Sequence, residues 1–184
     1  MSGREIDIVT TARLVGRRPE PGDAGAYVRI YGDSRTPEEW WPSNLRSSDH
    51  ARATLDKFIH HWQRWGFGLW TVLLPDGEII GHAGAQHTTV DGRSEVELGW
   101  FIHPGHWKQG YATEMAREGV RVAFDVLGLD DVVAFTVDRN AASRAVMEKL
   151  GMTYERDIEH AGLPHVLYRL SRGASQPVAG ETLA

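Results

Sequence analysis

ELGWFIHPGHWKQGYATEM, residues 97–115, joins an apolar strand-like run to the start of a helix. The helix opens at Gly110 with no evident capping side chain, although its first backbone N–H groups need a partner. Those N–H groups and the positive end of the helix dipole suit a phosphate, and a glycine lets a ligand approach closely. A tight turn whose amides are bound by water is the alternative, and this stretch alone leaves both interpretations open.

Composition indicates an ordinary globular domain. The chain has 184 residues, 41% hydrophobic and 24% charged, which is enough for one domain with a sizeable core. A net charge of −5 without a long basic run argues against a nucleic-acid partner. The absence of cysteine excludes disulfides, cysteine-ligated zinc and thiol nucleophiles. Because the sequence shows no apolar signal core and no segment of membrane length, we expect a cytoplasmic protein without a membrane partner.

Hydrophobic periodicity divides the rest of the chain into strands and helices. Before the quoted stretch it predicts a strand, two helices and three antiparallel strands, at 6–18, 24–31, 48–65, 66–74, 78–90 and 94–102. After it, the pattern predicts a helix, a buried strand, a second helix and a hairpin, at 109–126, 131–137, 140–150, 152–160 and 163–171.

The order of these elements predicts one α+β domain. The strand–helix–strand step through 126–137 implies one parallel strand pair inside a mostly antiparallel sheet. We therefore predict a single domain over residues 1–171, followed by a loose tail over 172–184.

Two motifs occur in order, the quoted stretch and DRNAASRAVMEKLGM at 138–152, joined by a predicted strand. Together they resemble the GNAT superfamily of acetyl-CoA-dependent N-acetyltransferases, and most closely its branch with the ribosomal-protein N-terminal (alanine/serine) acetyltransferases. The resemblance, from about Thr11 to Arg172, implies a GNAT-like mixed sheet with a central parallel pair flanked by helices. It also implies acetyl-CoA as the cofactor, and as acceptor a primary amine on a protein N-terminus or a small molecule. Neither a Walker-type loop nor G-x-G-x-x-G is present.

The resemblance implies a coenzyme site on the loop and on the strand before it. The family's phosphate loop (Gln or Arg, two residues, Gly, one residue, Gly or Ala) aligns with 107–112, although Trp107 departs from its first position. Backbone amides there would hold the coenzyme A pyrophosphate: Gln109, Gly110, Tyr111, Ala112 and Thr113. Backbone groups at the end of the strand would bind the pantetheine arm and polarise the thioester: Phe101, Ile102 and His103. Lys108 either contacts a coenzyme phosphate or is a solvated loop lysine.

The second motif supplies further candidates at the thioester. An asparagine at a helix start is first of all an N-cap, and the resemblance adds a contact from Asn140 to the pantetheine. It also places Ser143 near the thioester sulfur. Many relatives carry a tyrosine acid seven residues after this asparagine, where this chain has Met147. Because methionine cannot donate a proton, Ser143 or a water must replace the tyrosine.

Acetyl transfer also needs a base. The pKa of a lysine amine is about 10.4 and that of an α-amino group about 7.7–8.0, so a proton must leave as the amine attacks. The resemblance places Glu97 on the central strand near the reaction centre, which makes it the first candidate; a solvated strand glutamate is the equal alternative. The reserve candidates are Glu95, His82, His87 and His165.

Three other expectations follow. Neither histidine pair, His103 with His106 or His82 with His87, has an evident third ligand, so we predict no metal site. Trp40–Trp41 is predicted to line the acceptor groove, although such residues more often belong to the core. The leading function is an acetyltransferase that acts as a monomer or homodimer. A non-catalytic acetyl-CoA sensor of the same fold and a plain interaction domain remain as alternatives.

Overall fold

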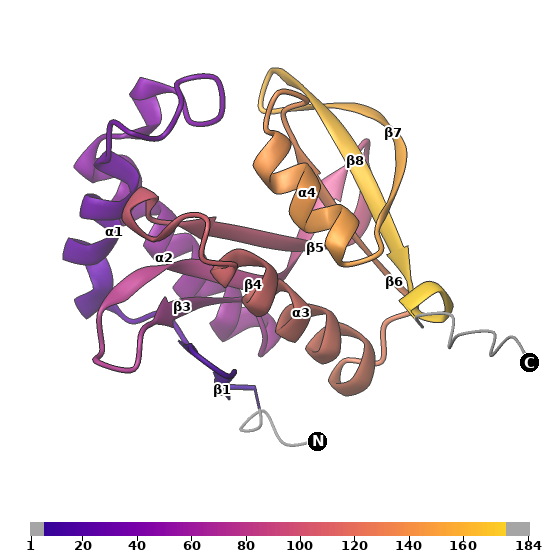
Figure 1. The fold of residues 1–184 in the computed structure, drawn as a ribbon, viewed down its shortest axis with the longest axis horizontal. Coiled ribbons are helices and arrows are strands. Elements are labelled where there is room, and N and C mark those ends of the chain that lie inside the picture. The colour runs from indigo at the N-terminus through magenta and orange to yellow at the C-terminus, as the bar shows by residue number, and fades with distance from the viewer. Residues whose placement is uncertain (1–5, 176–184) are drawn as a thin grey trace, which may run out of the picture.

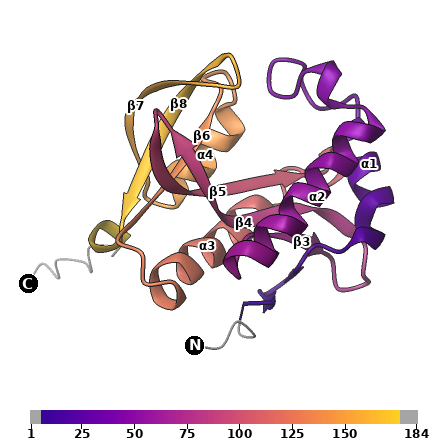
Figure 2. The ribbon, with the colours of Figure 1, turned by 180° about the vertical axis from the view of Figure 1, so that it is seen from behind.

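The computed structural model describes residues 6–175, and its eight strands form one sheet in the order β1-β2-β3-β4-β5-β6-β8-β7 (Figure 1). The strands are β1 (Ile8–Thr10), β2 (Val15–Arg17), β3 (Leu69–Leu73), β4 (Ile79–Val90), β5 (Arg93–Ile102), β6 (Asp131–Thr136), β7 (Thr153–His160) and β8 (Leu163–Ser171). The four α-helices are α1 (Ala24–Gly32), α2 (Ser48–Trp65), α3 (Tyr111–Arg121) and α4 (Ala141–Lys149). The helices α1 and α2 cover one face of the sheet, and α3 and α4 cover the other (Figures 1 and 2).

The predicted parallel pair is present between β5 and β6, and the other neighbouring strands are antiparallel. The register of the parallel pair consists of a single residue pair, Glu97 with Val133. Beyond it, β5 continues to Ile102 and β6 to Thr136 without pairing to each other, and the two strands run apart towards their C-terminal ends (Figure 1). One edge of each strand therefore has backbone groups that the other strand does not bind.

Arg169 of β8 binds β5 and β6 at the end where the two strands meet. Its guanidinium hydrogen-bonds both oxygens of Glu95 on β5, at 2.9 and 3.1 Å, and also binds Asp131 on β6 and Glu155 on β7. Glu95 lies two residues before Glu97, and Asp131 lies two residues before Val133. The arginine therefore joins β5 and β6 on the side where they meet and leaves the other side open. We call this four-residue cluster the Arg169 clasp.

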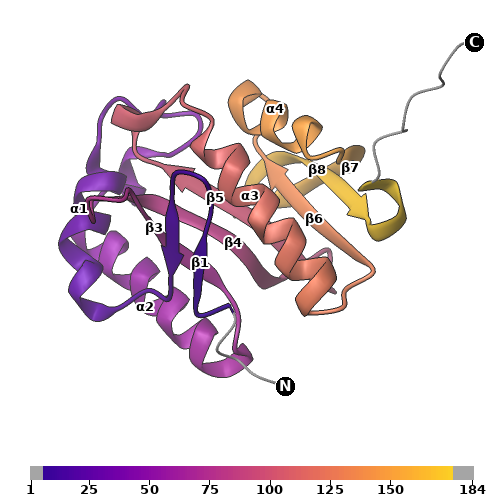
Figure 3. The ribbon, with the colours of Figure 1, turned by 60° about the horizontal axis from the view of Figure 1, so that its bottom comes forward.

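The helix α3 packs closely on β4 and β5 because glycines face each other across the contact (Figure 3). A Cβ atom added to Gly119 would lie 3.3 Å from Leu98 Cδ2 and 3.6 Å from the Gly84 backbone. The same helix buries Met115 and Ala116 in the main core. This close approach fixes the N-terminus of α3 beside the end of β5.

The predicted span of α2, residues 48–65, is confirmed at both ends. The Ser47 hydroxyl accepts a hydrogen bond from the His50 N–H at 3.1 Å, and Gly66 ends the helix in the left-handed region with φ 71°. The apolar side of the helix buries Ala51, Leu55 and Trp62.

Two of the predicted elements differ in the structure. The single strand predicted over 6–18 is two short strands, because Thr11 and Leu14 close a turn between them. The helix predicted from Gln109 begins at Tyr111, since Gly110 has a left-handed φ of 82°, and its last turn (Val122–Val126) is a π-helix.

The predicted tail begins with structure. Residues Arg172–Ser175 form a 3₁₀ helix, and the Arg172 guanidinium donates to the carbonyls of Phe124 and Leu129. The remainder of the predicted tail, 176–184, lies outside the described residues. Whether 1–171 behaves as a single folding domain stays a prediction.

The Arg169 clasp gives a test of stability. We expect Arg169→Met to lower the free energy of unfolding by about 2–3 kcal/mol, because it leaves the largely buried Glu95 carboxylate without a counter-charge. Urea denaturation measures the change. The control is Arg52→Met, which removes an exposed ion pair with Asp49 and should cost at most about 0.5 kcal/mol. Equal losses in the two variants would contradict a special role for the clasp.

Candidate active site

The loop between β5 and α3 presents free backbone amides. Gly110 is the N-cap of α3 and makes no side-chain cap hydrogen bond, while the first intrahelical bond is donated by the Glu114 N–H to the Gly110 carbonyl at 3.0 Å. The N–H groups of Tyr111, Ala112 and Thr113 therefore precede the first turn of hydrogen bonds. Gln109 and Gly110 are exposed beside them.

Lys108 is also exposed and has a left-handed φ of 62°. The alternation of left-handed residues at Lys108 and Gly110 turns the chain tightly before the helix. Concave loops of this kind are typical of anion sites. The predicted loop residues are thus brought together, while their contact with a coenzyme stays a prediction.

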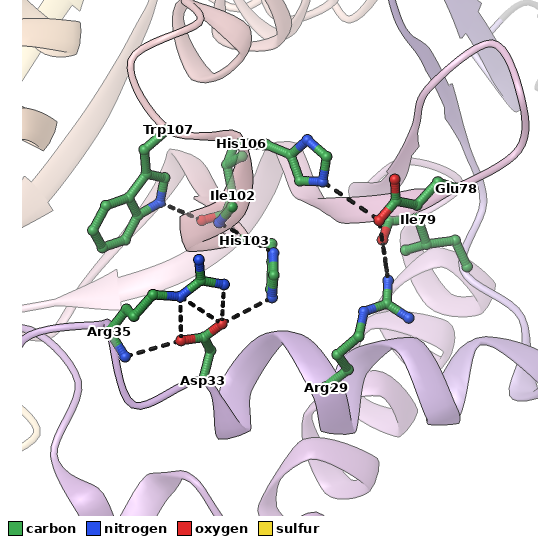
Figure 4. Close-up of polar contacts among 10 residues, drawn as sticks. Arg29, Asp33, Arg35, Glu78, Ile79, Ile102, His103, His106 and Trp107 are labelled. Carbon is green, nitrogen blue, oxygen red and sulfur yellow. Dashed lines mark hydrogen bonds and ion pairs between the residues drawn. The ribbon is translucent and has the colours of Figure 1, made fainter.

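The segment between β5 and α3 is fixed mainly by side chains, after a last backbone bond from the His103 N–H to the Ile80 carbonyl at 2.8 Å (Figure 4). The Trp107 indole N–H donates to the Ile102 carbonyl at 2.6 Å. His103 Nδ1 accepts the Gly105 N–H at 3.3 Å, so its Nε2–H donates to Asp33 at the end of α1, at 3.0 Å. Burial lowers the pKa of His103, and the neighbouring Asp33 carboxylate opposes that shift. The His103 side chain therefore anchors the loop to α1. Its backbone N–H donates to the Ile80 carbonyl and its carbonyl accepts the His106 N–H, so the coenzyme contact predicted for this backbone falls on groups that are already bound.

Asp33 is the centre of this anchor. Hydrogen bonds from Arg35 lower the pKa of Asp33 to about 2, so the carboxylate is charged throughout the working pH range. On the other side of the loop, His106 Nε2 lies 3.4 Å from Glu78 on the β3–β4 hairpin, and Arg29 binds the Ile79 carbonyl at 2.7 Å (Figure 4). Two elements from the N-terminal part of the chain thus hold the loop in place.

Glu97 lies where β5 and β6 separate, with its carboxylate on the face of β5 that also carries Gly99. Gln86, its register partner on β4, donates to Glu97 Oε2 at 3.0 Å. Gly99 has no side chain to cover the carboxylate, and a Cβ there would make ordinary contacts, 3.9 Å from Glu97 Oε1 and 3.4 Å from Leu69 Cδ2. Burial raises the pKa of Glu97 to about 7, and the hydrogen bond from Gln86 works in the opposite direction. A half-buried carboxylate that titrates near neutrality can accept a proton.

The start of α4 faces the same opening from β6. The Asn140 side chain caps the helix by accepting the Ser143 N–H at 3.1 Å, so its predicted N-cap role is confirmed. The Asn140 amide also donates to the hydroxyls of Thr136 and Ser143, both at 3.1 Å. Ser143 is half-buried, whereas Met147 is buried in the core with 1% of its surface exposed. Asn140 therefore orients the Ser143 hydroxyl at the edge of β6.

The reserve bases have other partners. Glu95 belongs to the Arg169 clasp. His82 is buried, its Nε2 lies 2.7 Å from the Tyr31 hydroxyl, and burial lowers its pKa to about 3. His87 packs against Trp65, with ring centroids 4.0 Å apart, and His165 Nδ1 contacts the Leu163 carbonyl at 2.9 Å. His82 is thus a core histidine with a hydrogen-bond partner, and His87 and His165 make other contacts.

The tryptophan pair Trp40 and Trp41 lies beside the loop between β5 and α3 and beside the end of β5. Trp41 stacks on Tyr31 at 4.9 Å and contacts Phe101 edge-on at 5.3 Å, while Trp40 packs against Trp107 at 5.9 Å. Within residues 6–175, the buried indole N–H groups of Trp40 and Trp41 have no hydrogen-bond partner. Their predicted place along the acceptor groove stays a prediction.

Comparison with known proteins identifies the family. Residues 13–153 match the family model described as an acetyltransferase (GNAT) domain. The chain belongs to the GNAT acetyltransferase family. The predicted family and fold are thereby confirmed, as is acetyl-CoA as the cofactor of this fold. The predicted class of acetyl-CoA-dependent acyltransferase is the class of the family.

Two curated relatives are similar along different lengths. The FsC-acetyl coenzyme A-N(2)-transacetylase of Aspergillus fumigatus is 43% identical over 95 residues, which are 48% of this chain and 40% of the fungal protein. The chain thus matches less than half of that relative. The uncharacterized N-acetyltransferase YoaA of Bacillus subtilis is 28% identical over 149 residues, covering 80% of this chain and 84% of YoaA.

Solved structures share the fold. An acetyltransferase from Agrobacterium tumefaciens superposes with a TM-score of 0.75 at 27% identity, covering 90% of this chain and 94% of its own. RimJ of Mycobacterium smegmatis, solved in complex with CoA-disulfide, has a TM-score of 0.74 at 19% identity, covering 93% of this chain and 90% of its own. These likenesses show the fold, and the branch of the family stays a prediction.

Two further observations concern predicted absences. Within the described part of the chain, no group of three or more His, Asp or Glu side chains is arranged to hold a metal ion. No described helix is both long enough and apolar enough to span a membrane. The predicted cytoplasmic location and the predicted monomer or homodimer stay predictions.

The phosphate loop can be tested by ligand-induced stabilisation. Coenzyme A at about 100 times its Kd should raise the melting temperature by about 5–10 °C, because it binds only the folded state. We expect Gly110→Asp to remove this shift, since it adds a negative charge at the N-terminus of α3. Gly110→Ala is the matched control: it imposes the same strain at φ 82° without a charge and should keep part of the shift. Wild-type affinity in Gly110→Asp would refute the assignment.

Proposed function

We propose that the protein transfers the acetyl group of acetyl-CoA directly to a primary amine, with Glu97 as the general base. The observation that carries this proposal is the Glu97 carboxylate at the point where β5 and β6 separate, with a pKa of about 7 and with no side chain at Gly99 to cover it. The coenzyme amides at the start of α3 and the Asn140–Ser143 pair at the start of α4 flank that point.

The proposed reaction begins with loss of a proton from the ammonium form of the acceptor. Glu97 accepts this proton, directly or through one water, while the amine nitrogen attacks the thioester carbonyl. The backbone edge of β5 near Phe101 and Ile102, which β6 does not bind, can donate an N–H to the developing oxyanion. The C–S bond then breaks, and the proton that the nitrogen still carries in excess of the amide passes to the coenzyme A thiolate, through the Ser143 hydroxyl or a water. The products are the amide and the free thiol.

The pKa of Glu97 favours one class of acceptor. An α-amino group has a pKa of about 7.7–8.0, within about one unit of the carboxylate, whereas a lysine amine at about 10.4 is more than three units away. Proton transfer from the α-ammonium is therefore the less uphill of the two. We accordingly place an α-amino group first, on a peptide N-terminus or on an amino-acid-derived small molecule. The N(2) in the name of the fungal relative is consistent with such an acceptor.

A panel of amines tests the activity itself. N-terminal peptides, amino-acid derivatives, polyamines and aminoglycosides are incubated with acetyl-CoA, and acetylated products are measured by mass spectrometry. We expect acetylation of α-amino groups. Tight binding of acetyl-CoA with no turnover on the panel would instead support a sensor of the same fold, and the absence of acetyl-CoA binding would support an interaction domain.

Glu97→Gln tests the base. At pH 7 we expect kcat to fall about 10²-fold, the usual scale for acid–base help. The wild-type profile should rise with pH through about 7 as Glu97 ionises, and the variant should lose this rise. The loss should shrink at high pH, where the amine deprotonates without assistance. Unchanged turnover at pH 7 on the true acceptor would transfer the role of base to an ordered water or another residue.

Stability provides the control for that variant. Because the pKa of Glu97 is raised in the folded state, the wild type loses stability as pH rises towards and through about 7. Glutamine carries no charge, so Glu97→Gln should be at least as stable as the wild type at pH 8. A loss of activity together with retained stability separates a missing base from a misfolded protein.

Ser143→Ala tests the leaving-group end. A thiol of pKa about 8.5 needs little protonation as it leaves at neutral pH, so we expect only about a tenfold loss of kcat. Helix capping should be retained, because Asn140 accepts the backbone N–H and not the hydroxyl of residue 143. Coenzyme A affinity, measured by calorimetry, should be nearly unchanged. A loss as large as that of Glu97→Gln would show that Ser143 does more than protonate the thiolate.

A further inference from the structure

Arg13, in the turn between β1 and β2, reaches the coenzyme loop from the other end of the chain. Its Nη1 donates to the Gln109 carbonyl at 2.8 Å, and its Nε and Nη2 bind Glu114 Oε2 at 2.8 and 2.6 Å. The guanidinium lies over the Tyr111 ring at 4.7 Å. A Cβ added to Gly110 would come within 3.5 Å of Arg13 Nη2. Arg13 therefore touches or neighbours four residues of the phosphate loop and the first turn of α3.

The turn that carries Arg13 is itself tied to α3. The Thr11 hydroxyl donates to Glu114 Oε1 at 2.6 Å, and the Arg13 backbone N–H donates to the same oxygen at 2.9 Å. The turn is closed by the Thr11 N–H, which binds the Leu14 carbonyl at 2.9 Å. The hairpin forms the β1–β2 edge of the sheet, and its turn reaches the start of α3 through these bonds. The guanidinium is thus held at the loop by both its backbone and its side chain.

Glu114 poses an electrostatic problem at this place. It lies in the first turn of α3, at the end of the helix where a pyrophosphate would bind. Burial opposes its ionisation, but the hydrogen bonds from Thr11 and Arg13 outweigh burial and lower its pKa, so Glu114 is an anion at neutral pH. Alone, a carboxylate favours a helix N-terminus, but it repels a second anion bound to the same amides. Something must neutralise Glu114 for the coenzyme phosphates to bind well.

We propose that Arg13 is a positioning residue of the coenzyme site, which neutralises Glu114 and fixes the Gln109 carbonyl so that the neighbouring amides face the pyrophosphate. This inference rests on the proposed use of that loop for acetyl-CoA. Three of the five guanidinium N–H directions are committed to Glu114 and Gln109, and the side chain remains 49% exposed. An arginine fork suits this double task, because it binds carboxylate and carbonyl in one plane.

A merely structural role for Arg13 predicts a different result from the electrostatic one. A structural defect weakens all turnover, whereas the proposed role concerns only the phosphate-bearing part of the donor. Acetyl-pantetheine has the same thioester without phosphates, so it reports on the reaction centre alone. Coenzyme A binding reports on the phosphate loop without any turnover.

The experiment measures coenzyme A affinity by calorimetry, and kcat and KM with acetyl-CoA and acetyl-pantetheine. We expect Arg13→Met to weaken coenzyme A binding about tenfold or more, with kcat at saturating acetyl-CoA changed less than about twofold. The kcat/KM for acetyl-pantetheine should stay within about twofold of the wild type. Arg18→Met is the matched control, because Arg18 pairs with Asp7 and lies over Trp62, away from the loop; its affinity should equal that of the wild type.

Variants of Glu114 separate charge from packing. Glu114→Gln removes the opposing carboxylate and should bind coenzyme A at least as tightly as the wild type. The double variant Arg13→Met/Glu114→Gln should recover at least threefold of the affinity lost in Arg13→Met. Arg13→Lys keeps a charge without the fork and should lie between the wild type and Arg13→Met. If Arg13→Met fails to fold, Arg13→Lys and Glu114→Gln are compared with the wild type alone. Arg13→Lys should then bind coenzyme A more weakly than the wild type, and equal affinity would contradict the proposal.

Several outcomes would overturn the inference. It fails if Arg13→Met binds coenzyme A as tightly as the wild type, or if acetyl-CoA and acetyl-pantetheine lose kcat/KM equally. It also fails if Glu114→Gln weakens binding as much as Arg13→Met does. Failure of the coenzyme site itself looks different, because the wild type would then show no coenzyme A binding, whatever residue occupies position 13.

Discussion

The rest of the structure depends on how little β5 and β6 touch. Their parallel register contains one residue pair, Glu97 with Val133, and the Arg169 clasp holds the strands together on one side of it. On the other side, each strand has one edge that the other strand does not bind. The sheet is therefore continuous, but its two central strands separate. The Glu97 carboxylate, at the point where the strands separate, is supported by β4 through Gln86, and Gly99 next to it has no side chain to cover it. The proposed chemistry therefore takes place where the pairing of β5 and β6 is interrupted.

Charge at this opening is balanced locally rather than by the whole protein. The chain has a net charge of −5, which is unfavourable for a coenzyme rich in phosphates. The loop that is proposed to hold the phosphates relies on backbone amides and on a helix start, whose partial charges do not enter that sum. Two acidic side chains beside the loop are each paired with a base, Asp33 with Arg35 and His103, and Glu114 with Arg13. Overall composition therefore says little about which ligand the loop attracts.

The sequence predicted elements whose signals are local. Helix α2 has a serine N-cap and a terminal glycine, and the strand–turn–strand series at 66–102 alternates with period two, so both were found. The turn inside 6–18 was missed, because Thr11 and Leu14 close it without a glycine or proline. In the candidate site, Glu97 was predicted by resemblance, and Gly110 and Asn140 by the helix-start pattern together with the resemblance; their functional roles stay predictions. Their supports Gln86, Asp33 and Arg13 were not predicted, because cross-strand register and contacts over about a hundred residues leave no pattern in the sequence.

Glu97 shows what the proposed function costs the fold. A carboxylate whose pKa rises from 4.5 to about 7 makes the ionised native state less stable by about 3 kcal/mol, at 1.36 kcal/mol per unit. That is a large part of the 5–15 kcal/mol that usually stabilises a domain. The hydrogen bond from Gln86 offsets some of this cost, and a second strong donor would offset more, but it would also return the pKa towards 4.5 and make the carboxylate too weak a base for an ammonium near pKa 8. The proposed role as a base therefore limits how strongly hydrogen bonds can stabilise the ionised carboxylate. The stability must come from elsewhere, and the Arg169 clasp two residues away on both strands is placed to supply part of it.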